Sequence, residues 1–138
     1  MANTVAFTLI TPLAVKFDGQ AELVIAVGTE GEVGILPSHA PYLTALRPGV
    51  LRANIPDHGA THRLELACSE GFLQALPDKI TILADAALER DEVDIAQARA
   101  DLSAAEEEQR AAGGDLAAYR RAQNKIDFAN ARLTVAGV

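Results

Sequence analysis

Few side chains in this sequence could do acid–base, nucleophilic or metal chemistry, and their spacing assembles no catalytic set. Ser38 and His39 are adjacent, but they lie outside any nucleophile-elbow context, and no arrangement of Asp or Ser marks His39 as a general base. His58 and His62 are four residues apart across a predicted turn, with no cysteine or third histidine nearby to complete a metal site. The sequence contains no Gly-x-x-x-x-Gly-Lys-Ser/Thr loop to cradle phosphates. We therefore predict no catalytic residue, no metal site and no intrinsic ATP hydrolysis.

Composition narrows the class of partner. Hydrophobic residues make up 49% of the 138 residues, which is enough for an ordered core. The net charge of −7 disfavours binding to nucleic acid or to anionic lipid, because both are themselves negatively charged. The single cysteine, Cys68, ends an apolar run and is predicted to be a packed thiol in a reducing compartment. We find no signal peptide and no apolar run near the roughly 20 residues of a membrane helix, and so expect no direct membrane insertion.

The predicted secondary structure that positions these residues changes near Arg90, from strands before it to helices after it. Before it, short apolar or alternating runs are separated by turn signals about every 8–12 residues, a pattern typical of an antiparallel sandwich or barrel. Turns are expected at Asp18-Gly19, at Pro56–Gly59 and at Pro77-Asp78. The expected strands are Val5–Thr11, Leu13–Phe17, Leu23–Val27, Val50–Ile55, Arg63–Cys68, Phe72–Leu76 and Lys79–Ala84.

After Arg90 the sequence is rich in alanine and charge, which predicts two helices. Asp91 is the expected cap of the first, Gly113-Gly114 breaks the pattern, and Asp115 is the expected cap of the second. Because the turn is short, the helices must run antiparallel. The positions that recur at helical spacing and are expected to form the seams are Val93, Ala96, Ala100 and Ala104 on the first helix, and Leu116, Tyr119, Gln123, Ile126, Ala129 and Leu133 on the second. A seam made mostly of alanine gains little from burial, so the hairpin is expected to detach from the β domain at modest cost.

One run carries a family resemblance. The segment Glu30–Pro41 reads Glu-Gly-Glu-Val-Gly-Ile-Leu-Pro-Ser-His-Ala-Pro and continues through Leu43–Gly49, and Ser69–Phe72 and Thr81–Ala87 agree further along the chain. In this order, and on this architecture, the sequence resembles the ε subunit of the rotary F-type ATP synthase. The resemblance implies an α+β fold: an N-terminal antiparallel β-sandwich over residues 1–88, followed by a C-terminal antiparallel two-helix hairpin over residues 89–138.

The resemblance also implies a function. Members of this family are non-catalytic central-stalk subunits that clamp the γ shaft, rest on the membrane c ring and couple rotation to ATP synthesis. At matching positions, Glu32 and His39 are the expected contacts with the c ring or γ. The expected location is peripheral, on the cytoplasmic face of a bacterial plasma membrane.

The resemblance implies that the hairpin can either fold down on the β domain or extend into the catalytic α/β head, where it inhibits ATP hydrolysis. A basic face on the second helix would meet an acidic segment there; here that face comprises Arg120, Arg121, Lys125 and Arg132. An equally weighted alternative is that these cations are solvated or pair with the acidic first helix.

Some family members bind ATP on the folded hairpin through an Ile/Leu-Asp-x-x-Arg-Ala motif. This sequence keeps Ile95, Arg99 and Ala100, together with Arg132 on the second helix, but has Ala96 in place of the aspartate. We expect no cofactor, and weak or absent ATP binding.

Two other classes of protein remain open on the residues alone. One is a free-standing β-sandwich ligand-binding module with a helical dimerisation hairpin. The other is a small hydrolase using His39, which the missing nucleophile disfavours.

Overall fold

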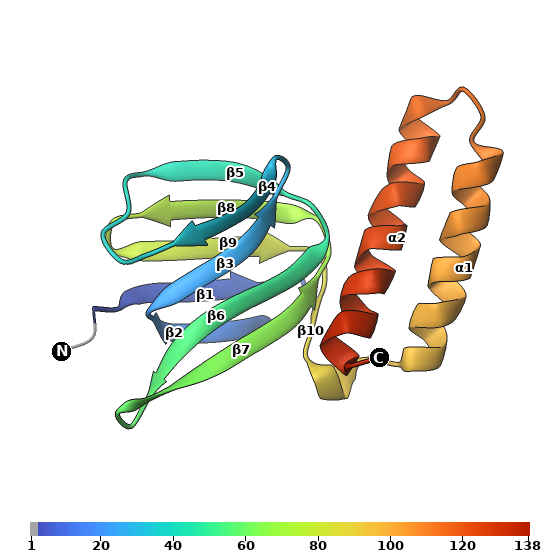
Figure 1. Ribbon diagram of the computed structural model, residues 1–138. Helices are drawn as coiled ribbons and strands as arrows, with labels where there is room; N and C mark the ends of the chain where they lie inside the picture. Colours follow the sequence, from blue (N-terminus) through green and yellow to red (C-terminus); the bar gives the residue numbers. More distant parts are fainter. Residues whose placement is uncertain (1–2) are drawn as a thin grey trace.

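The computed structural model describes residues 3–138 and shows a β-sandwich with a helical hairpin beside one of its ends (Figure 1). The strands are β1 (Val5–Ile10), β2 (Val15–Ala21), β3 (Leu23–Gly28), β4 (Gly31–Ile35), β5 (Tyr42–Leu46), β6 (Gly49–Asp57), β7 (Ala60–Cys68), β8 (Gly71–Leu76), β9 (Lys79–Ala84) and β10 (Ala87–Leu88). A 3₁₀ turn, η1 (Arg90–Glu92), leads to α1 (Ile95–Ala111) and α2 (Leu116–Ala136). The predicted fold class, a β-sandwich followed by a two-helix hairpin, is confirmed.

Hydrogen bonding links the strands in the order β10-β7-β6-β3-β5-β8-β9-β1-β2, with β4 paired to β3. One layer therefore contains β10, β7, β6, β3 and β4, and the other contains β5, β8, β9, β1 and β2. The layers join where Gly28 of β3 pairs with Leu46 of β5, and backbone bonds from Arg47 to Val27 and from Thr29 to Ala45 flank this pair. Neighbours pair antiparallel except β1 and β9, which are parallel.

The core lies between the layers and is filled by alternate residues of the strands. In β1, Val5, Phe7 and Leu9 are buried, and in β9 Ile80 and Ile82 are fully buried on either side of half-buried Thr81. This alternation is the one expected of strands that face a core on one side and solvent on the other.

One predicted turn is wrong. Asp18 and Gly19 lie inside β2, where Gly19 pairs with Phe7 of β1. A Cβ on Gly19 would lie 3.1 Å from Cζ of Phe17, whose ring packs 5.3 Å from that of Phe7, centroid to centroid. The glycine makes room for this aromatic pair within a strand. Strands β4 and β5, which no strand prediction covered, occupy the family-like run and its continuation.

The other two turns are confirmed. His58 and Gly59 join β6 and β7 with φ of 48° and 84°, the positive values that a two-residue type I′ turn requires. Pro77-Asp78 joins β8 and β9, whose ladder begins at the adjacent pair Leu76–Lys79.

The first helix starts three residues later than predicted. Its N-cap is Asp94, whose carboxylate accepts a hydrogen bond from the backbone N–H of Gln97, while Asp91 lies in η1. Asp115 caps α2 as expected, accepting from the N–H of Ala118. The buried positions of α1 are Ala98 and Ala105, whereas Ala96, Ala100 and Ala104 are exposed, so the predicted seam of α1 is wrong.

Helix α2 uses two faces because it lies between α1 and the sandwich, packing on α1, β6 and β7. Ala122, Ala129 and Ala136 are buried at seven-residue intervals, and Ile126 and Leu133 are half-buried between them, in part as predicted. Leu116 and Tyr119, predicted for the same stripe, are 59% and 45% exposed near the hairpin turn. A second stripe, not predicted, faces the sandwich and consists of Asn124, Phe128, Ala131 and Val135.

Cys68 lies buried at the end of β7, opposite Gly49 of β6 and Ala87 of β10. Burial raises the pKa of its thiol to about 12. We expect Cys68 to react with a thiol reagent at pH 8 only through unfolding, because about one thiol in 10⁴ would be ionised at that pH. Labelling should then keep pace with global unfolding as urea is raised; rapid labelling of the native protein would contradict the burial.

Candidate functional site

An apolar pocket opens on the outer face of the β5-β8-β9-β1 layer. Strand register aligns Ala45, Phe72, Leu83 and Ile10 in one row across the four strands. They line a cavity of about 530 Å³ together with the turn after β1. Phe72 and Leu83 are 59% and 49% exposed, and Leu13 beside the pocket is 96% exposed. Large apolar side chains gathered in one exposed patch indicate a surface that binds another macromolecule.

Sequence reasoning missed this pocket, although a signal was present. At the pocket end of β8 and β9 both faces are apolar: Leu73 and Ile82 enter the core while the neighbouring Phe72 and Leu83 point outward. The broken alternation at these two pairs predicts strands covered on both sides. Only the register shows that the outward residues meet.

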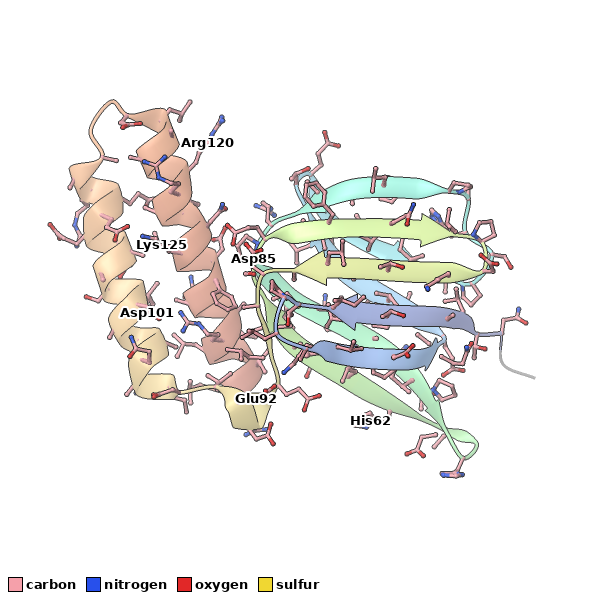
Figure 2. The ribbon with its side chains drawn as sticks, turned by 180° about the vertical axis from the view of Figure 1, so that it is seen from behind. His62, Asp85, Glu92, Asp101, Arg120 and Lys125 are labelled. Carbon is pink, nitrogen blue, oxygen red and sulfur yellow. The ribbon has the colours of Figure 1, made fainter. Side chains whose placement is uncertain are left out.

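Two carboxylates lie on the rim of the pocket, beside the helical hairpin. Glu70 and Asp85 both line the pocket, and the N–H of Asp85 bonds to the backbone oxygen of Glu70 over 3.4 Å. Figure 2 shows Asp85 where the sandwich faces the hairpin. The Glu70 carboxylate also accepts a hydrogen bond of 3.1 Å from the Asn124 amide of α2. The pocket therefore borders the contact between the two parts of the molecule.

Glu32 and His39 lie apart, towards the two ends of β4. Glu32 accepts a hydrogen bond of 2.6 Å from Arg52 of β6, and His39 bonds through Nδ1 to the oxygen of Ala40 over 2.7 Å. Tyr42 lies between them: its ring packs edge-on to His39, and it lines a polar hollow of about 450 Å³ with Glu32. This hollow lies between the edges of β4 and β5, so the two predicted residues flank one open edge of the sandwich.

The four predicted basic residues divide into two pairs. Lys125 bonds to Glu108 over 2.9 Å and Arg132 to Asp101 over 2.9 Å, so both cations join α2 to α1. Hydrogen bonds from Gln97 and then from Arg132 lower the pKa of Asp101. The Arg132 guanidinium also lies 4.7 Å from the ring centre of Phe128. For these two residues the structure shows the pairing that sequence analysis left as an alternative.

Arg120 and Arg121 have a different setting. Both are exposed on the first half of α2, and neither forms an ion pair with any residue in the range 3–138. Figure 2 places Arg120 near the turn between the helices. Exposed Leu116 and Tyr119 lie on the same helical turns. This end of the hairpin can offer both charge and apolar area to a partner.

The residues of the degenerate ATP motif do not converge. Arg99 and Ala100 are exposed on α1, whereas Arg132 lies in the interhelical hollow beside Asp101. That hollow, of about 330 Å³, is lined by Asp101, Ala104, Ala105, Glu108, Lys125, Phe128 and Arg132. Each of its two cations already has a carboxylate partner, which leaves little positive potential for phosphate.

Within residues 3–138 no helix is long and apolar enough to cross a membrane. Over the same range, no three His, Cys, Asp or Glu side chains gather as metal ligands would.

Comparison with known proteins gives the family. Residues 4–90 match the family described as ATP synthase, Delta/Epsilon chain, beta-sandwich domain. The ATP synthase epsilon chain of Syntrophobacter fumaroxidans is 39% identical over 136 residues, which cover 99% of this chain and 98% of the relative. The epsilon chain of Chromobacterium violaceum is 41% identical over 100 residues, 72% of this chain and 70% of the relative. The chain belongs to the ATP synthase ε-chain family.

This membership confirms the identification made from Glu30–Pro41, and with it a non-catalytic part in ATP synthase. Solved structures agree on the fold of the ε-family chain. A chain in the Euglena gracilis mitochondrial ATP synthase structure matches with a TM-score of 0.75 and 19% identity, covering 96% of this chain and 81% of that one. A chain in the Tetrahymena thermophila mitochondrial ATP synthase central stalk and c-ring structure matches with a TM-score of 0.62 and 18% identity, covering 97% of each chain.

Proposed function

We propose that this ε-family chain is a central-stalk subunit of the proton-translocating ATP synthase, clamping the γ shaft to the c ring and coupling rotation to ATP synthesis. The observation that carries the proposal is the exposed apolar pocket around Phe72, in a chain whose family is that of the ATP synthase ε chain. Burying Phe72 and Leu83 against a partner would remove exposed apolar area from water, the main source of stable association.

Different surfaces suit different partners. The apolar pocket, with Glu70 and Asp85 on its rim, suits the γ shaft, since a permanent partner buries apolar surface and a charged rim sets orientation. The polar edge that Glu32 and His39 flank suits the c ring or the foot of γ. Such contacts would hold the subunit peripherally at the membrane. The proposed location is the cytoplasmic face of a bacterial plasma membrane, because the relatives named above come from bacteria.

The hairpin is the proposed brake on ATP hydrolysis, by contact with the catalytic α/β head. Arg120 and Arg121 are available for this contact in the observed conformation. Lys125 and Arg132 would become available only after leaving Glu108 and Asp101, that is, when α1 and α2 separate. In this proposal residues 1–88 bind the rotor, and residues 89–138 regulate ATP hydrolysis.

Reconstitution tests the proposal. The full chain and a version ending at Glu92 would be added to ATP synthase heads lacking ε, and co-elution with γ and the rate of ATP hydrolysis measured. We expect both to bind and only the full chain to slow hydrolysis. Binding without slowing by either would remove the brake and keep the clamp. Failure of both to bind a matched γ would refute the central-stalk role.

We expect ATP to bind weakly or not at all to the isolated chain. The pairs Glu108–Lys125 and Asp101–Arg132 neutralise the cations of the interhelical hollow, and Ala96 replaces the aspartate of the motif. Titration calorimetry should give no dissociation constant below about 1 mM, equivalent to about −4 kcal/mol. A dissociation constant for ATP in the low micromolar range would contradict this prediction.

A further inference from the structure

The chain between the sandwich and the hairpin is held to the sandwich as far as Glu92. Strand β10 pairs Ala87 with Cys68 and Leu88 with Ala67, which fixes the segment to β7. The following turn, η1, is closed by bonds from Glu92 N–H to the Glu89 oxygen and from Val93 N–H to the Arg90 oxygen, of 3.0 and 3.3 Å. The turn has no buried residue, so apolar burial contributes little to holding it in place.

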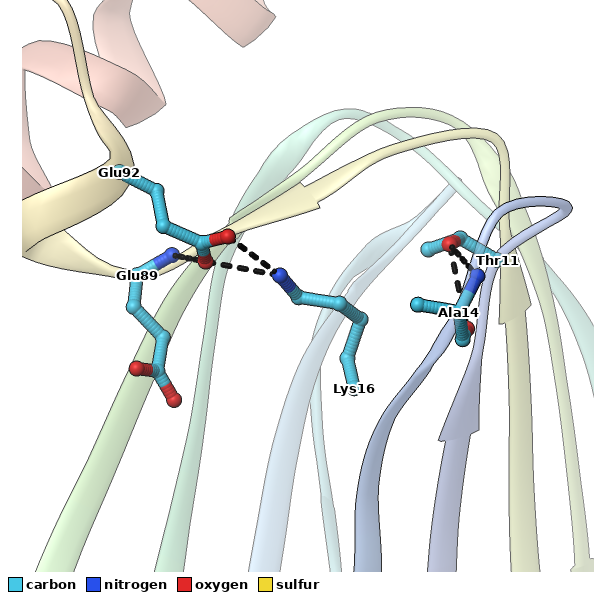
Figure 3. A network of polar contacts seen from close by, with 5 residues as sticks. All are labelled: Thr11, Ala14, Lys16, Glu89 and Glu92. Carbon is cyan, nitrogen blue, oxygen red and sulfur yellow. Dashed lines mark hydrogen bonds and ion pairs between the residues drawn. The ribbon is translucent and has the colours of Figure 1, made fainter.

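One polar contact joins η1 to the far edge of the other layer. Lys16 Nζ lies 2.7 and 2.8 Å from the two carboxylate oxygens of Glu92 (Figure 3). Lys16 belongs to β2, and β2 and β10 are the two ends of the strand order, so the pair bridges the open side of the sandwich. The same carboxylate accepts a 3.0 Å bond from the N–H of Glu89. That bond and the Lys16 contact lower the pKa of Glu92.

Lys16 is itself well positioned. Its side chain is only 17% exposed, and the turn before β2 is closed by reciprocal hydrogen bonds between Thr11 and Ala14, two of them through the Thr11 hydroxyl (Figure 3). A lysine fixed in this way loses less freedom when it pairs than one on a flexible loop does. Glu92 also holds the turn itself, so breaking the pair should loosen the turn.

Beyond Glu92 the chain continues to α1 through two residues with extended backbone. Val93 and Asp94 are extended, with φ and ψ of −82° and 125°, and −89° and 105°. Asp94 already caps α1, and α2 returns to touch η1 at its C-terminal end, where Arg90 lies beside Gly137. These two extended residues connect η1 to α1 along the chain.

We propose that the Lys16–Glu92 pair is a tether that keeps residues 89–92 on the sandwich when the hairpin moves, so that the joint lies at Val93–Asp94. This inference rests on the proposed movement of the hairpin. It shifts the mechanical boundary four residues beyond the sequence-based boundary at residue 89. It also assigns to Lys16, 76 residues away from Glu92, a positioning role in hairpin movement.

Residue-resolved hydrogen exchange on the full chain tests the tether. The reporters are the amides of Glu89, Glu92 and Val93, each of which donates one of the bonds described above. The hairpin is undocked by Ala131→Glu, which places a carboxylate at a position only 3% exposed on the stripe facing the sandwich. We expect Ala131→Glu to speed exchange along α2 and to leave the three reporters unchanged.

Adding Lys16→Met should speed exchange of the reporters at least about five-fold, whether or not the hairpin is docked. Lys16→Arg should keep the slow rates, since it can still pair with Glu92. Lys79→Met, an exposed lysine on β9, is the matched control and should have no effect.

Two results would overturn the tether: reporters unaffected by Lys16→Met in both backgrounds, or reporters that accelerate together with α2 in Ala131→Glu alone. If Ala131→Glu fails to loosen α2, the Lys16→Met variant of the docked protein decides the question. These measurements use the isolated chain, so a failure to bind γ would refute the proposed function without affecting the tether.

Discussion

Replacing Gly71 with alanine is expected to unfold the sandwich or to destabilise it by about 3 kcal/mol or more. A Cβ at this position would lie 1.9 Å from the backbone oxygen of Leu83 and 2.9 Å from the Cα of Ala84. Both atoms belong to the main chain of β9, which pairs with Gly71, so no side-chain rotation relieves the clash. The measurement is urea unfolding followed by circular dichroism.

Gly34→Ala is the matched control. Gly34 also lies in a strand, but its nearest neighbour to an added Cβ is Leu23 Cδ1 at 3.8 Å, an ordinary contact. We expect a change within about 1 kcal/mol there, since alanine restricts the unfolded chain and meets no obstruction. Equal stabilities of the two variants would show that β8 and β9 can separate locally without cost.

Replacing Phe72 with alanine is expected to weaken binding to the γ subunit by about 30-fold or more, equivalent to about 2 kcal/mol. Phe72 is 59% exposed at the centre of the four-strand row, so its truncation removes contact with a partner while the core residue Leu73 stays in place. The urea midpoint should change little. Affinity is measured by surface plasmon resonance with immobilised γ.

Leu116→Ala provides the comparison for this experiment. Leu116 is exposed to the same 59% but lies on the hairpin, away from the pocket. It should leave the affinity for γ unchanged while the Phe72 variant loses it. If the two variants bind alike, γ does not use the pocket, and the clamp must lie elsewhere on the sandwich.

The start of α1 could not be predicted from the neighbouring residues alone. Asp91 and Asp94 are both acceptable N-caps by residue type, and nothing nearby distinguishes them. In the structure α1 begins after Asp94, and Asp91 lies in η1, where the neighbouring Glu92 pairs with Lys16, 76 residues away in the sequence. The structure distinguishes the two candidate caps, whereas residue type alone does not.

The two faces of α2 make a similar point. The periodicity of the sequence predicts the stripe that faces α1, and Ala129 is one of its buried residues. The second stripe mixes Asn124, Phe128, Ala131 and Val135, a set whose polarity does not mark it as an interface. These residues form an interface because Glu70 bonds to Asn124 and residues 62–65 of β7 lie near Val135.

Sequence alone determined the features that depend on neighbouring residues. Alternation predicted most of the strands, and the run Pro56–Gly59 predicted a turn. Gly113-Gly114 separated the two helices, and the run Glu30–Pro41 indicated the family. Each depends on backbone preferences or on the periodic exposure of side chains over a few residues.

The tertiary structure decided which distant residues meet. The row of Ala45, Phe72, Leu83 and Ile10 exists only because four strands pair in one register, and the Lys16–Glu92 pair only because the sandwich brings its two edges to one side. Register and edge placement are collective outcomes of core packing, since shifting one strand by a residue would turn every side chain on it to the other face. Local sequence does not contain that information.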